Sequence, residues 1–332
     1  MTRSEPLSAS GLVGVLAGAS LGVLATGCWM MQGIPWGQDD DTDTDSETGT
    51  ETGTETDTET ESTTQDPHQM CNIDILFVID SSQSMMLTLD NLVTDGFSGF
   101  IGMMSSYPQP GTIRVAVTNH LWDPTYIGGQ WVEPTGFMTS GWQGSQHNID
   151  MCDEVTNNDC FFMSGQRWME GPSPTLQAEF TCVGNLPCQE DLSVGEPTLE
   201  AGVYALEYEA PTGFIRPDAL LFVVFITDEE DQSAMPITQI RDRLLAVKDD
   251  EELFLDVEEY VYVATIAGNQ SGGCDDGDFF GEADPTPEII QFTAQFGPNG
   301  RHFDMCATTI ESALSSMSGM MQAGCSEVFD LD

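Results

Sequence analysis

Two stretches of consecutive apolar residues mark the framework of the chain. Residues 75–79 and Ala219–Ile226 contain no polar side chain. Such runs predict strands that are covered on both faces, as in the middle of a parallel sheet. Other apolar stretches predict strands at residues 113–117, 260–267 and 301–304. The chain therefore has the strands for a largely parallel sheet.

Apolar residues recur at helical spacing between these strands. This spacing predicts helices from just after Met85 to near Pro108, at 198–208, at 237–247, at 287–296 and from 308 to near the end of the chain. Thr308 and Glu311 match the capping-box pattern that opens a helix. Strands that alternate with helices indicate an α/β fold, with a doubly wound, Rossmann-like sheet flanked by helices.

Residues 123–194 break this alternation. The segment is rich in Gly, Pro, Trp and Cys, and a connection of this length is usually functional or a small stapled insertion. We expect Trp131, Trp142 and Trp168 to fill a small core within it, with a binding surface as the alternative. We therefore assign residues 69–332 to one domain with a disulfide-rich insertion at about 123–194.

The chain contains nine cysteines, and disulfides are expected if it is exported. Setting Cys28 aside leaves an even number. Pairs close in sequence are favoured within the insertion, a pair flanking the first strand and the last helix would close the domain, and two cysteines then remain. The predicted pairs are Cys152–Cys160, Cys182–Cys188, Cys71–Cys325 and Cys274–Cys306. Zinc binding is the alternative, but the sequence has no C-x-x-C and its four histidines are scattered.

The amino terminus carries an export signal. Residues 11–25 form an apolar segment that is short for a membrane span but typical of a signal peptide. It ends in L-A-T-G-C, which resembles the lipobox of bacterial lipoproteins, and the resemblance implies cleavage before Cys28 and lipidation of that residue. Residues 1–27 are then the signal peptide, and the protein is exported and lipid-anchored to a bacterial membrane in the cell envelope, on its periplasmic or surface side. A transmembrane anchor or an ordinary signal peptide is the alternative.

A polar tether separates this signal from the domain. Within residues 28–68, Thr and Ser alternate with Asp and Glu over a long stretch without any large apolar residue. Such a composition predicts a disordered, self-repelling linker that holds the domain away from the membrane. The whole chain has a formal net charge of −47, from 8 Lys and Arg against 55 Asp and Glu. This balance argues against nucleic acid as a partner and favours cations.

Small oxygen-bearing side chains cluster where the predicted strands end. Asp80, Ser82 and Ser84 follow the first apolar run at alternate positions, Thr198 opens a helix, and Asp228 follows the second run. Because the carboxyl ends of parallel strands share one edge of a sheet, these residues are expected to converge. Two carboxylates and three hydroxyls suit Mg²⁺, with Mn²⁺ or Ca²⁺ as competitors. So few charged ligands would leave the ion able to bind an outside carboxylate.

These segments resemble the motifs of the von Willebrand factor type A domain and its metal-ion-dependent adhesion site. The stretch D-I-L-F-V-I-D-S-S-Q-S-M resembles the first motif, G-E-P-T-L-E-A-G the threonine loop, and F-V-V-F-I-T-D-E-E-D the last motif. The resemblance covers about residues 71–325 apart from the insertion. It implies a Rossmann-like sheet and metal-dependent binding of protein ligands, through an Asp or Glu of the partner, without catalysis.

Two departures from the family pattern change the expected site. The last motif continues into Glu229, Glu230 and Asp231, which would crowd the site with negative charge. The threonine loop contains Glu196 as well as Thr198, and either residue could bind the ion.

Other functions have less support in the sequence. The chain lacks G-x-S-x-G, H-E-x-x-H and a Gly-rich phosphate loop, so we expect a protein that is not an enzyme. His120 lies beyond a predicted strand and is expected to be a solvated loop histidine, although it could approach the metal. The alternative function is a structural envelope protein with a silent metal site, whose acidic surface collects cations.

Overall fold

The computed structural model describes residues 71–82, 84–104, 110–120, 140–142, 157–186, 195–249, 256–276 and 281–329. The predicted signal peptide, the lipidation site Cys28 and the linker at 28–68 lie outside the described residues, as do Cys152 and Cys188. No helix within the described ranges is long and apolar enough to cross a membrane.

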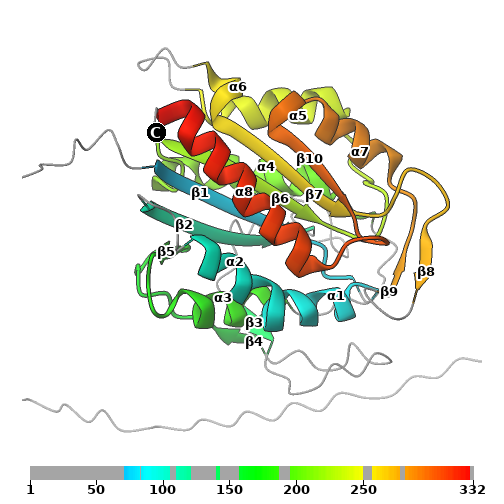
Figure 1. Cartoon of the computed structure of the whole chain (residues 1–332), viewed down its shortest axis with the longest axis horizontal. Helices are drawn as coiled ribbons and strands as arrows, with labels where there is room; N and C mark the ends of the chain where they lie inside the picture. The colour runs from blue at the N-terminus through cyan, green and yellow to red at the C-terminus, as the bar shows by residue number, and fades with distance from the viewer. Residues whose placement is uncertain are drawn as a thin grey trace, which may run out of the picture. The chain divides into compact units, whose positions relative to one another are not determined.

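A mixed sheet forms the centre of the domain (Figure 1). Its strands are β1 (Cys71–Ile79), β2 (Pro110–Asn119), β5 (Met169–Gly171), β6 (Ala219–Ile226), β7 (Val261–Ala267) and β10 (Gly300–Asp304). They lie in the order β10-β7-β6-β1-β2-β5. Only the edge strand β5 is antiparallel to its neighbour, and the other pairs are parallel. The predicted α/β class is confirmed, with an antiparallel edge that the sequence did not indicate.

Helices cover both faces of this sheet (Figure 1). One face carries α1 (Met86–Asn91), α2 (Phe97–Met104), α3 (Leu176–Gly184) and α8 (Ile310–Phe329). The other face carries α4 (Thr198–Glu209), α5 (Ile237–Ala246) and α7 (Pro287–Ala294). The remaining described helices are a π-helical turn at Leu92–Gly96, the short helix α6 (Val257–Tyr260) and 3-10 turns at Ala210–Thr212 and Gly297–Asn299. Two further antiparallel pairs are β3 (Ser140–Trp142) with β4 (Asn157–Asp159) and β8 (Cys274–Asp276) with β9 (Gly281–Ala283).

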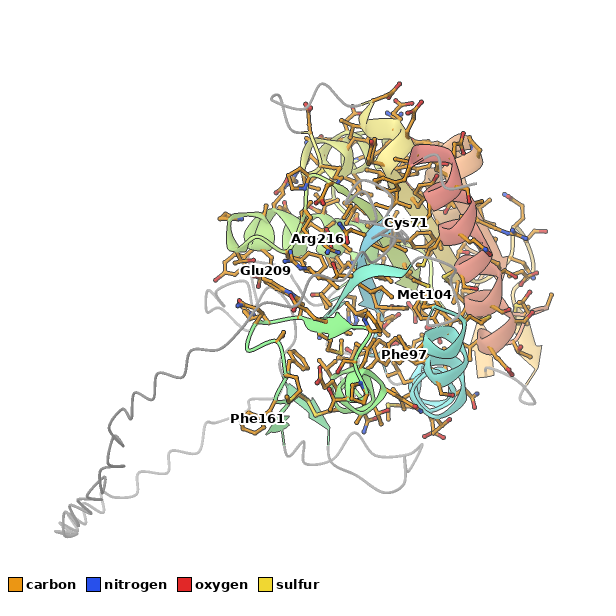
Figure 2. The ribbon with its side chains drawn as sticks, turned by 60° about the vertical axis from the view of Figure 1, so that its left-hand side comes forward. Cys71, Phe97, Met104, Phe161, Glu209 and Arg216 are labelled. Atoms are coloured by element: carbon orange, nitrogen blue, oxygen red, sulfur yellow. A yellow bond between two sulfur atoms is a disulfide. The ribbon has the colours of Figure 1, made fainter. Side chains whose placement is uncertain are left out.

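The apolar runs explain why the central strands are buried on both sides. Along β1, Phe77 packs with the helices of one face, whereas Leu76 and Val78 pack with those of the other. Because side chains alternate along a strand, an unbroken apolar run can supply both cores. Phe97 and Met104 of α2 are buried against the sheet (Figure 2).

The second half of the predicted insertion is built into the main domain. It supplies β5 to the sheet, and Phe180 of α3 stacks on Phe97 with ring centroids 3.4 Å apart. Trp168 is buried in the main core beside Phe214, so the prediction of a separate small core is wrong for this residue.

Among the described residues the structure contains three disulfides. Two are the predicted Cys71–Cys325 and Cys274–Cys306. The third joins Cys160 to Cys182, so the predicted pairs Cys152–Cys160 and Cys182–Cys188 are wrong. Cys160 precedes β5 and Cys182 lies on α3, and the packing of these two elements brings the cysteines together although they are 22 residues apart.

The start of α8 also differs from its prediction by one residue. The Ser312 amide donates to the Thr309 hydroxyl at 3.2 Å, so Thr309 caps the helix in place of Thr308.

Candidate metal centre

The carboxyl ends of three neighbouring strands bring the predicted site residues together. In the sheet Ile79 of β1 is paired with Asn119 of β2 and with Ile226 of β6. Asp80 therefore follows β1 at the level where His120 follows β2 and Thr227 follows β6. The Asp80 amide donates to the Ile226 carbonyl at 2.8 Å, which extends the ladder into the loop. Parallel strands thus place the two motif loops beside each other, as the sequence predicted.

Asp80 is buried and its carboxylate is held from two sides. Oδ1 accepts a hydrogen bond from the Ser82 amide at 2.8 Å, and Oδ2 accepts one from the Thr227 hydroxyl at 2.8 Å. The hydroxyls of Ser82 and Ser84 lie 2.9 Å apart. The alternate spacing of the first motif therefore gathers its three oxygen-bearing side chains in one turn.

His120 is a site residue rather than a solvated loop residue. Its side chain is buried, its Nδ1 accepts a hydrogen bond from the Ser81 amide at 3.1 Å, and the same atom lies 3.1 Å from Asp80 Oδ1. The expectation of a solvated histidine is wrong, because β2 runs two residues further than predicted and ends directly before His120.

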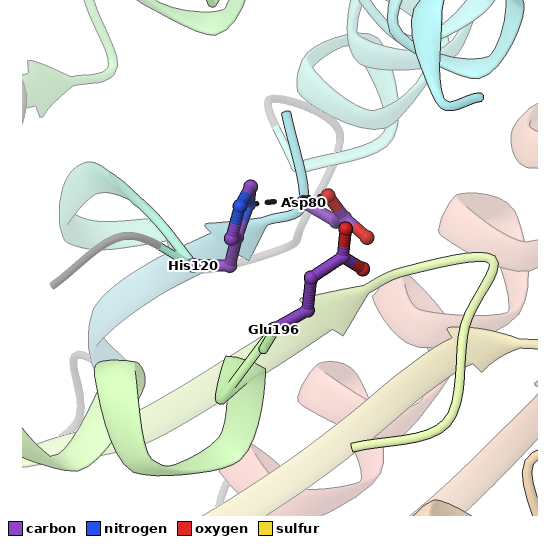
Figure 3. Close-up of side chains that lie close together, drawn as sticks. All are labelled: Asp80, His120 and Glu196. Carbon is purple, nitrogen blue, oxygen red and sulfur yellow. Dashed lines mark ion pairs between the residues drawn. The ribbon is translucent and has the colours of Figure 1, made fainter. Parts of the chain in front are cut away.

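The threonine loop brings Glu196 and Thr198 to the same edge. The Glu196 carbonyl accepts hydrogen bonds from the Thr198 amide at 2.8 Å and the Gln232 amide at 3.1 Å, which fixes the loop before α4. Its carboxylate points toward Asp80 (Figure 3). One ligand atom from each of Asp80, His120 and Glu196 lies within 4.8 Å of the other two.

Several buried oxygens at this edge have no hydrogen-bond partner in the described part of the chain. They include Ser81 Oγ, Glu196 Oε2, Thr198 Oγ1 and Asp228 Oδ1. Leaving a polar atom buried and unpartnered is costly, so such atoms are rare in folded proteins. A cation bound at this edge would supply a partner to buried oxygens of this kind.

The pKa values of the carboxyl groups at this edge also favour a bound cation. Burial, together with the charge of Asp80, raises the pKa of Asp228 to about 8 and the pKa of Glu196 to about 9. Burial also acts to raise the pKa of Asp80, but the hydrogen bond and charge of His120 outweigh it, and this pKa falls to about 2. Asp80 therefore stays ionised, whereas its two neighbours keep their protons at neutral pH unless a positive charge joins them.

The donor set fits a divalent cation. Asp80 and Asp228 offer carboxylates, and Ser82, Ser84 and Thr198 offer hydroxyls, all of them hard oxygen ligands of the kind that Mg²⁺, Mn²⁺ and Ca²⁺ accept. A hydrogen bond between Ser84 and Asp228 links the first motif to the last. These residues would hold the ion, which supplies a positive charge and a position for an outside ligand.

Two of the acidic residues at the end of the last motif have structural roles that the sequence did not predict. Asp231 Oδ1 accepts a hydrogen bond from the Leu199 amide at 3.0 Å, at the start of α4. The Glu230 carboxylate accepts from the amides of Glu288 and Ile289, at the start of α7. Glu229 is the member of this group that raises the pKa of both Glu196 and Asp228. Two of the three acids therefore bind helix ends, and the predicted crowding is reduced to Glu229.

Comparisons with known proteins gave matches among solved structures only. No family model and no curated protein matches the chain. Proximal thread matrix protein 1 from the mussel byssus is similar over 77% of this chain and 47% of its own, with 10% identity and a TM-score of 0.36. An aerotolerance-related membrane protein from Bacteroides fragilis is similar over 76% of this chain and 99% of its own, with 11% identity and a TM-score of 0.37. The manganese-loaded TRAP protein of Plasmodium vivax is similar over 78% and 74%, with 10% identity and a TM-score of 0.35.

This chain thus spans about half the length of the mussel structure, 47%. Its own geometry is more informative than these distant neighbours. The parallel strands β10, β7, β6, β1 and β2, with helices on both faces, form the Rossmann-like sheet that the sequence motifs implied. The described part of the chain has the fold of a von Willebrand factor type A domain.

Proposed function

We propose that this protein is a binding module that holds one divalent cation at Asp80, Ser82, Ser84, Thr198 and Asp228 and recognises a protein partner through it. The buried oxygens of Thr198 and Asp228 that have no partner support this proposal most directly. They lie on different elements, since Thr198 opens α4 and Asp228 follows β6.

The partner binds through a carboxylate of Asp or Glu. Asp80, Thr198 and Asp228 are buried, whereas Ser84 is exposed, so the ion would be enclosed on one side and reachable on the other. An ion that keeps a position open at its accessible side accepts a further hard oxygen ligand. Long-range repulsion between the acidic domain and an acidic partner is screened by salt over about 10 Å at 0.1 M, while direct coordination persists.

The protein acts in the cell envelope, held to a membrane by a lipid on Cys28 and extended from it by the linker at 28–68. The disulfides within the described residues support an oxidising compartment, since such bonds are rare in the cytosol. The sequence pattern before Cys28 supports export and lipidation. Substitution of Cys28 by Ala should release the protein from the membrane fraction or leave its precursor uncut.

Titration calorimetry with Mg²⁺, Mn²⁺ and Ca²⁺ tests the site. Wild-type protein should bind one ion, and Asp80→Ala should weaken binding at least tenfold. Asp249→Ala is the matched control, because Asp249 is an exposed carboxylate at the opposite end of the sheet. Its neighbour Lys248 contacts the Pro217 carbonyl, just before β6 begins. Equal binding by all three proteins would show that the site is silent.

Recovery of a partner from envelope extracts tests the second half of the proposal. Wild type and Asp249→Ala should retain the same protein in Mg²⁺ or Mn²⁺ and lose it in EDTA, and Asp80→Ala should not retain it in either condition. Retention that is unaffected by both EDTA and Asp80→Ala would indicate an acidic surface that acts without a specific ion.

A further inference from the structure

His120 and Glu196 lie beside the five proposed ligands but are not among them. Their ligand atoms lie within 4.8 Å of each other and of a ligand atom of Asp80. Figure 3 shows the three side chains converging from the ends of β1 and β2 and from the loop before α4. Donor atoms that bind one ion at about 2.1 Å lie about 3 Å apart at adjacent positions of its coordination shell. The spacing of this triad therefore falls in the range that one ion can bridge.

The contact between His120 and Asp80 is informative because of the position of the Ser81 amide. That amide donates to His120 Nδ1 at 3.1 Å, so Nδ1 carries a lone pair. The same lone-pair-bearing atom lies 3.1 Å from Asp80 Oδ1. This contact is favourable only when a positive charge lies between the two atoms. That charge is either a proton on Nδ1, which gives the hydrogen bond that lowers the pKa of Asp80, or a bound cation that takes the place of the proton.

Glu196 adds a second independent observation. Its Oε2 is buried without a hydrogen-bond partner, although its carboxylate points at Asp80 (Figure 3). The loop holds it there, since a side chain at Gly195 would meet Gln232 Oε1 at 2.7 Å and the Glu196 carbonyl is bound by two amides. The Glu196 carboxylate is therefore held beside the buried His120 imidazole, in a position to bind a metal ion.

We infer that His120 and Glu196 bind the same ion as Asp80, so that the site selects transition-metal ions such as Zn²⁺ or Mn²⁺ over Mg²⁺ and Ca²⁺. This inference rests on the proposed function and specifies the ion that performs it. Imidazole nitrogen is a good ligand for transition metals and a poor one for Mg²⁺ and Ca²⁺, which prefer oxygen. When the ion binds, Nδ1 coordinates it and no longer accepts the hydrogen bond from the Ser81 amide. That loss is offset, because a single neutral hydrogen bond is much weaker than a metal–imidazole bond.

A histidine variant separates the two kinds of ion. His120→Asn removes the imidazole and keeps a side-chain oxygen that can accept from the Ser81 amide. His302→Asn is the matched control, because His302 is the other described histidine and lies on β10, at the far edge of the sheet from β2. Since most protein sites prefer Zn²⁺ to Mg²⁺, the quantity that decides is the change between variants and not the preference itself.

Dissociation constants for Zn²⁺, Mn²⁺ and Mg²⁺ are measured by competition titration on tag-free protein. We expect His120→Asn to weaken Zn²⁺ binding at least tenfold and Mg²⁺ binding less than threefold, and His302→Asn to change neither. Glu196→Gln should weaken all three ions. Equal losses for Zn²⁺ and Mg²⁺ in His120→Asn, or no loss, would overturn the inference and leave the proposed function intact. Failure of wild type to bind any ion would overturn both.

A spectroscopic measurement makes the test independent of the variant's stability. Protein loaded with one equivalent of Cu²⁺ should show nitrogen hyperfine coupling in its electron paramagnetic resonance spectrum. Labelling histidine with ¹⁵N should alter that coupling, and His302→Asn should leave it unchanged. A spectrum with oxygen ligands alone would overturn the inference.

Discussion

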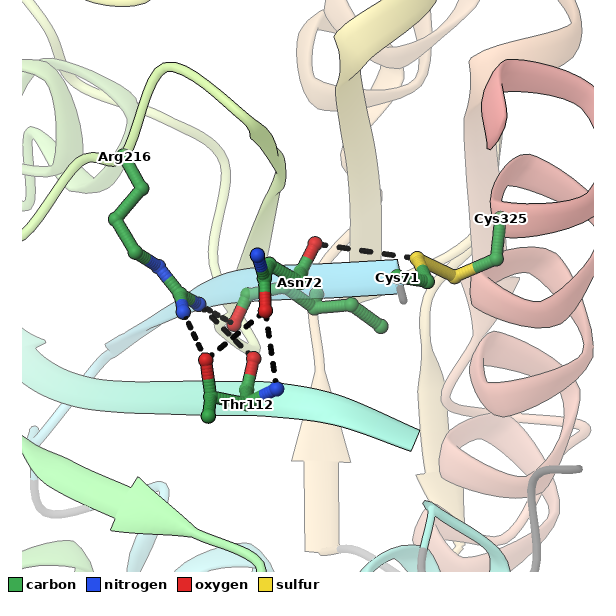
Figure 4. Close-up of a disulfide and its surroundings, with 6 residues drawn as sticks. Cys71, Asn72, Thr112, Arg216 and Cys325 are labelled. Carbon is green, nitrogen blue, oxygen red and sulfur yellow. Dashed lines mark hydrogen bonds between the residues drawn. A yellow bond between two sulfur atoms is a disulfide. The ribbon is translucent and has the colours of Figure 1, made fainter. Parts of the chain in front are cut away.

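A buried aspartate lies near each end of strand β1, and the two carboxylates have different kinds of partner. At the amino end, Asp74 Oδ1 lies 2.6 Å from Arg216 Nη2, and its Oδ2 accepts from the Arg216 amide at 2.7 Å. Figure 4 shows Arg216 and the Cys71–Cys325 disulfide at this end of the strand. At the carboxyl end, Asp80 faces no arginine or lysine among the described residues, and the carboxyl groups of Glu196 and Asp228 share its surroundings.

The difference separates a structural end of the sheet from a functional one. We call the surroundings of Asp74, Arg216 and the Cys71–Cys325 disulfide the closed end, and those of Asp80, Glu196, Thr198 and Asp228 the open end. At the closed end, both oxygens of Asp74 have partners and the first strand is covalently joined to the last helix. At the open end, buried oxygens lack partners. The closed end pairs its buried carboxylate with an arginine, whereas the open end leaves buried oxygens of Glu196, Thr198 and Asp228 without partners, which indicates that the open end binds something from outside.

The largest effect is expected from removing the disulfide of the closed end. Cys71–Cys325 joins residues 254 apart in sequence, and in the chain-entropy model a loop of that length contributes about 5 kcal/mol. The double substitution Cys71→Ser/Cys325→Ser should lower the free energy of unfolding by about that amount in chemical denaturation. Cys160→Ser/Cys182→Ser is the control, with a shorter loop of 22 residues and an expected loss of about 3 kcal/mol. A larger loss in the control would contradict this ranking.

Breaking the closed-end ion pair should come next. Arg216→Met leaves Asp74 buried without its partner, and breaking a buried pair in this way typically costs about 3–5 kcal/mol. Denaturation at neutral pH measures the loss, and affinity for the ion should stay within twofold of wild type because Arg216 lies at the other end of β1. Loss of ion binding in a variant that is still folded would show that the two ends are not independent.

The third prediction concerns pH and the open end. Because burial raises the pKa of Asp228 to about 8 and of Glu196 to about 9, the unfolded chain releases these protons at lower pH than the folded one. The metal-free protein should therefore lose stability as pH rises from about 4 to 9. The lowered pKa of Asp80 acts in the opposite sense, but only below about pH 4.

Denaturation in EDTA and in saturating Mn²⁺ at pH 5, 7 and 9 checks this trend. The ion takes the place of the protons, so it should restore most of the loss at high pH and its binding should release protons at pH 7. Parallel pH profiles with and without the ion would contradict the assignment of these groups to the site.

Much of the fold could be predicted because its signals are local. The predicted strand Ala219–Ile226 has the same limits in the structure, and apolar runs of this kind identify buried strands without knowledge of their neighbours. The edge strand Met169–Gly171 is too short to show a hydrophobic pattern. Its pairing with β2 depends on tertiary structure, which local sequence does not reveal. The Cys160–Cys182 pair likewise depends on the packing of α3, which local spacing does not reveal.

The candidate site shows the same limit. Asp80, Thr198 and Asp228 could be found because each directly follows or opens a predicted element. His120 was placed outside the site because β2 was ended two residues early, and extending the strand to Asn119 would have aligned it with Asp80. The supporting role of Asp231 depends on its contact with the Leu199 amide, which no sequence pattern indicated.

The smallest expected effect concerns this support. Asp231→Ala removes the acceptor for the Leu199 amide in the first turn of α4, and loss of such a cap costs about 1 kcal/mol. Because the same helix positions Thr198, ion affinity should fall about threefold in calorimetry. Asp249→Ala should change neither quantity, and an Asp231→Ala variant indistinguishable from it would show that the contact is incidental.

The central claim is that the open end, and not the closed end, binds the ion. Crystals soaked in MnCl₂ and measured at the manganese absorption edge test it directly. The account predicts one strong anomalous peak among the side-chain atoms of Asp80, Thr198 and Asp228, with Glu196 and His120 in contact with it. Peaks confined to exposed carboxylates, or no peak at the open end at millimolar Mn²⁺, would contradict the account.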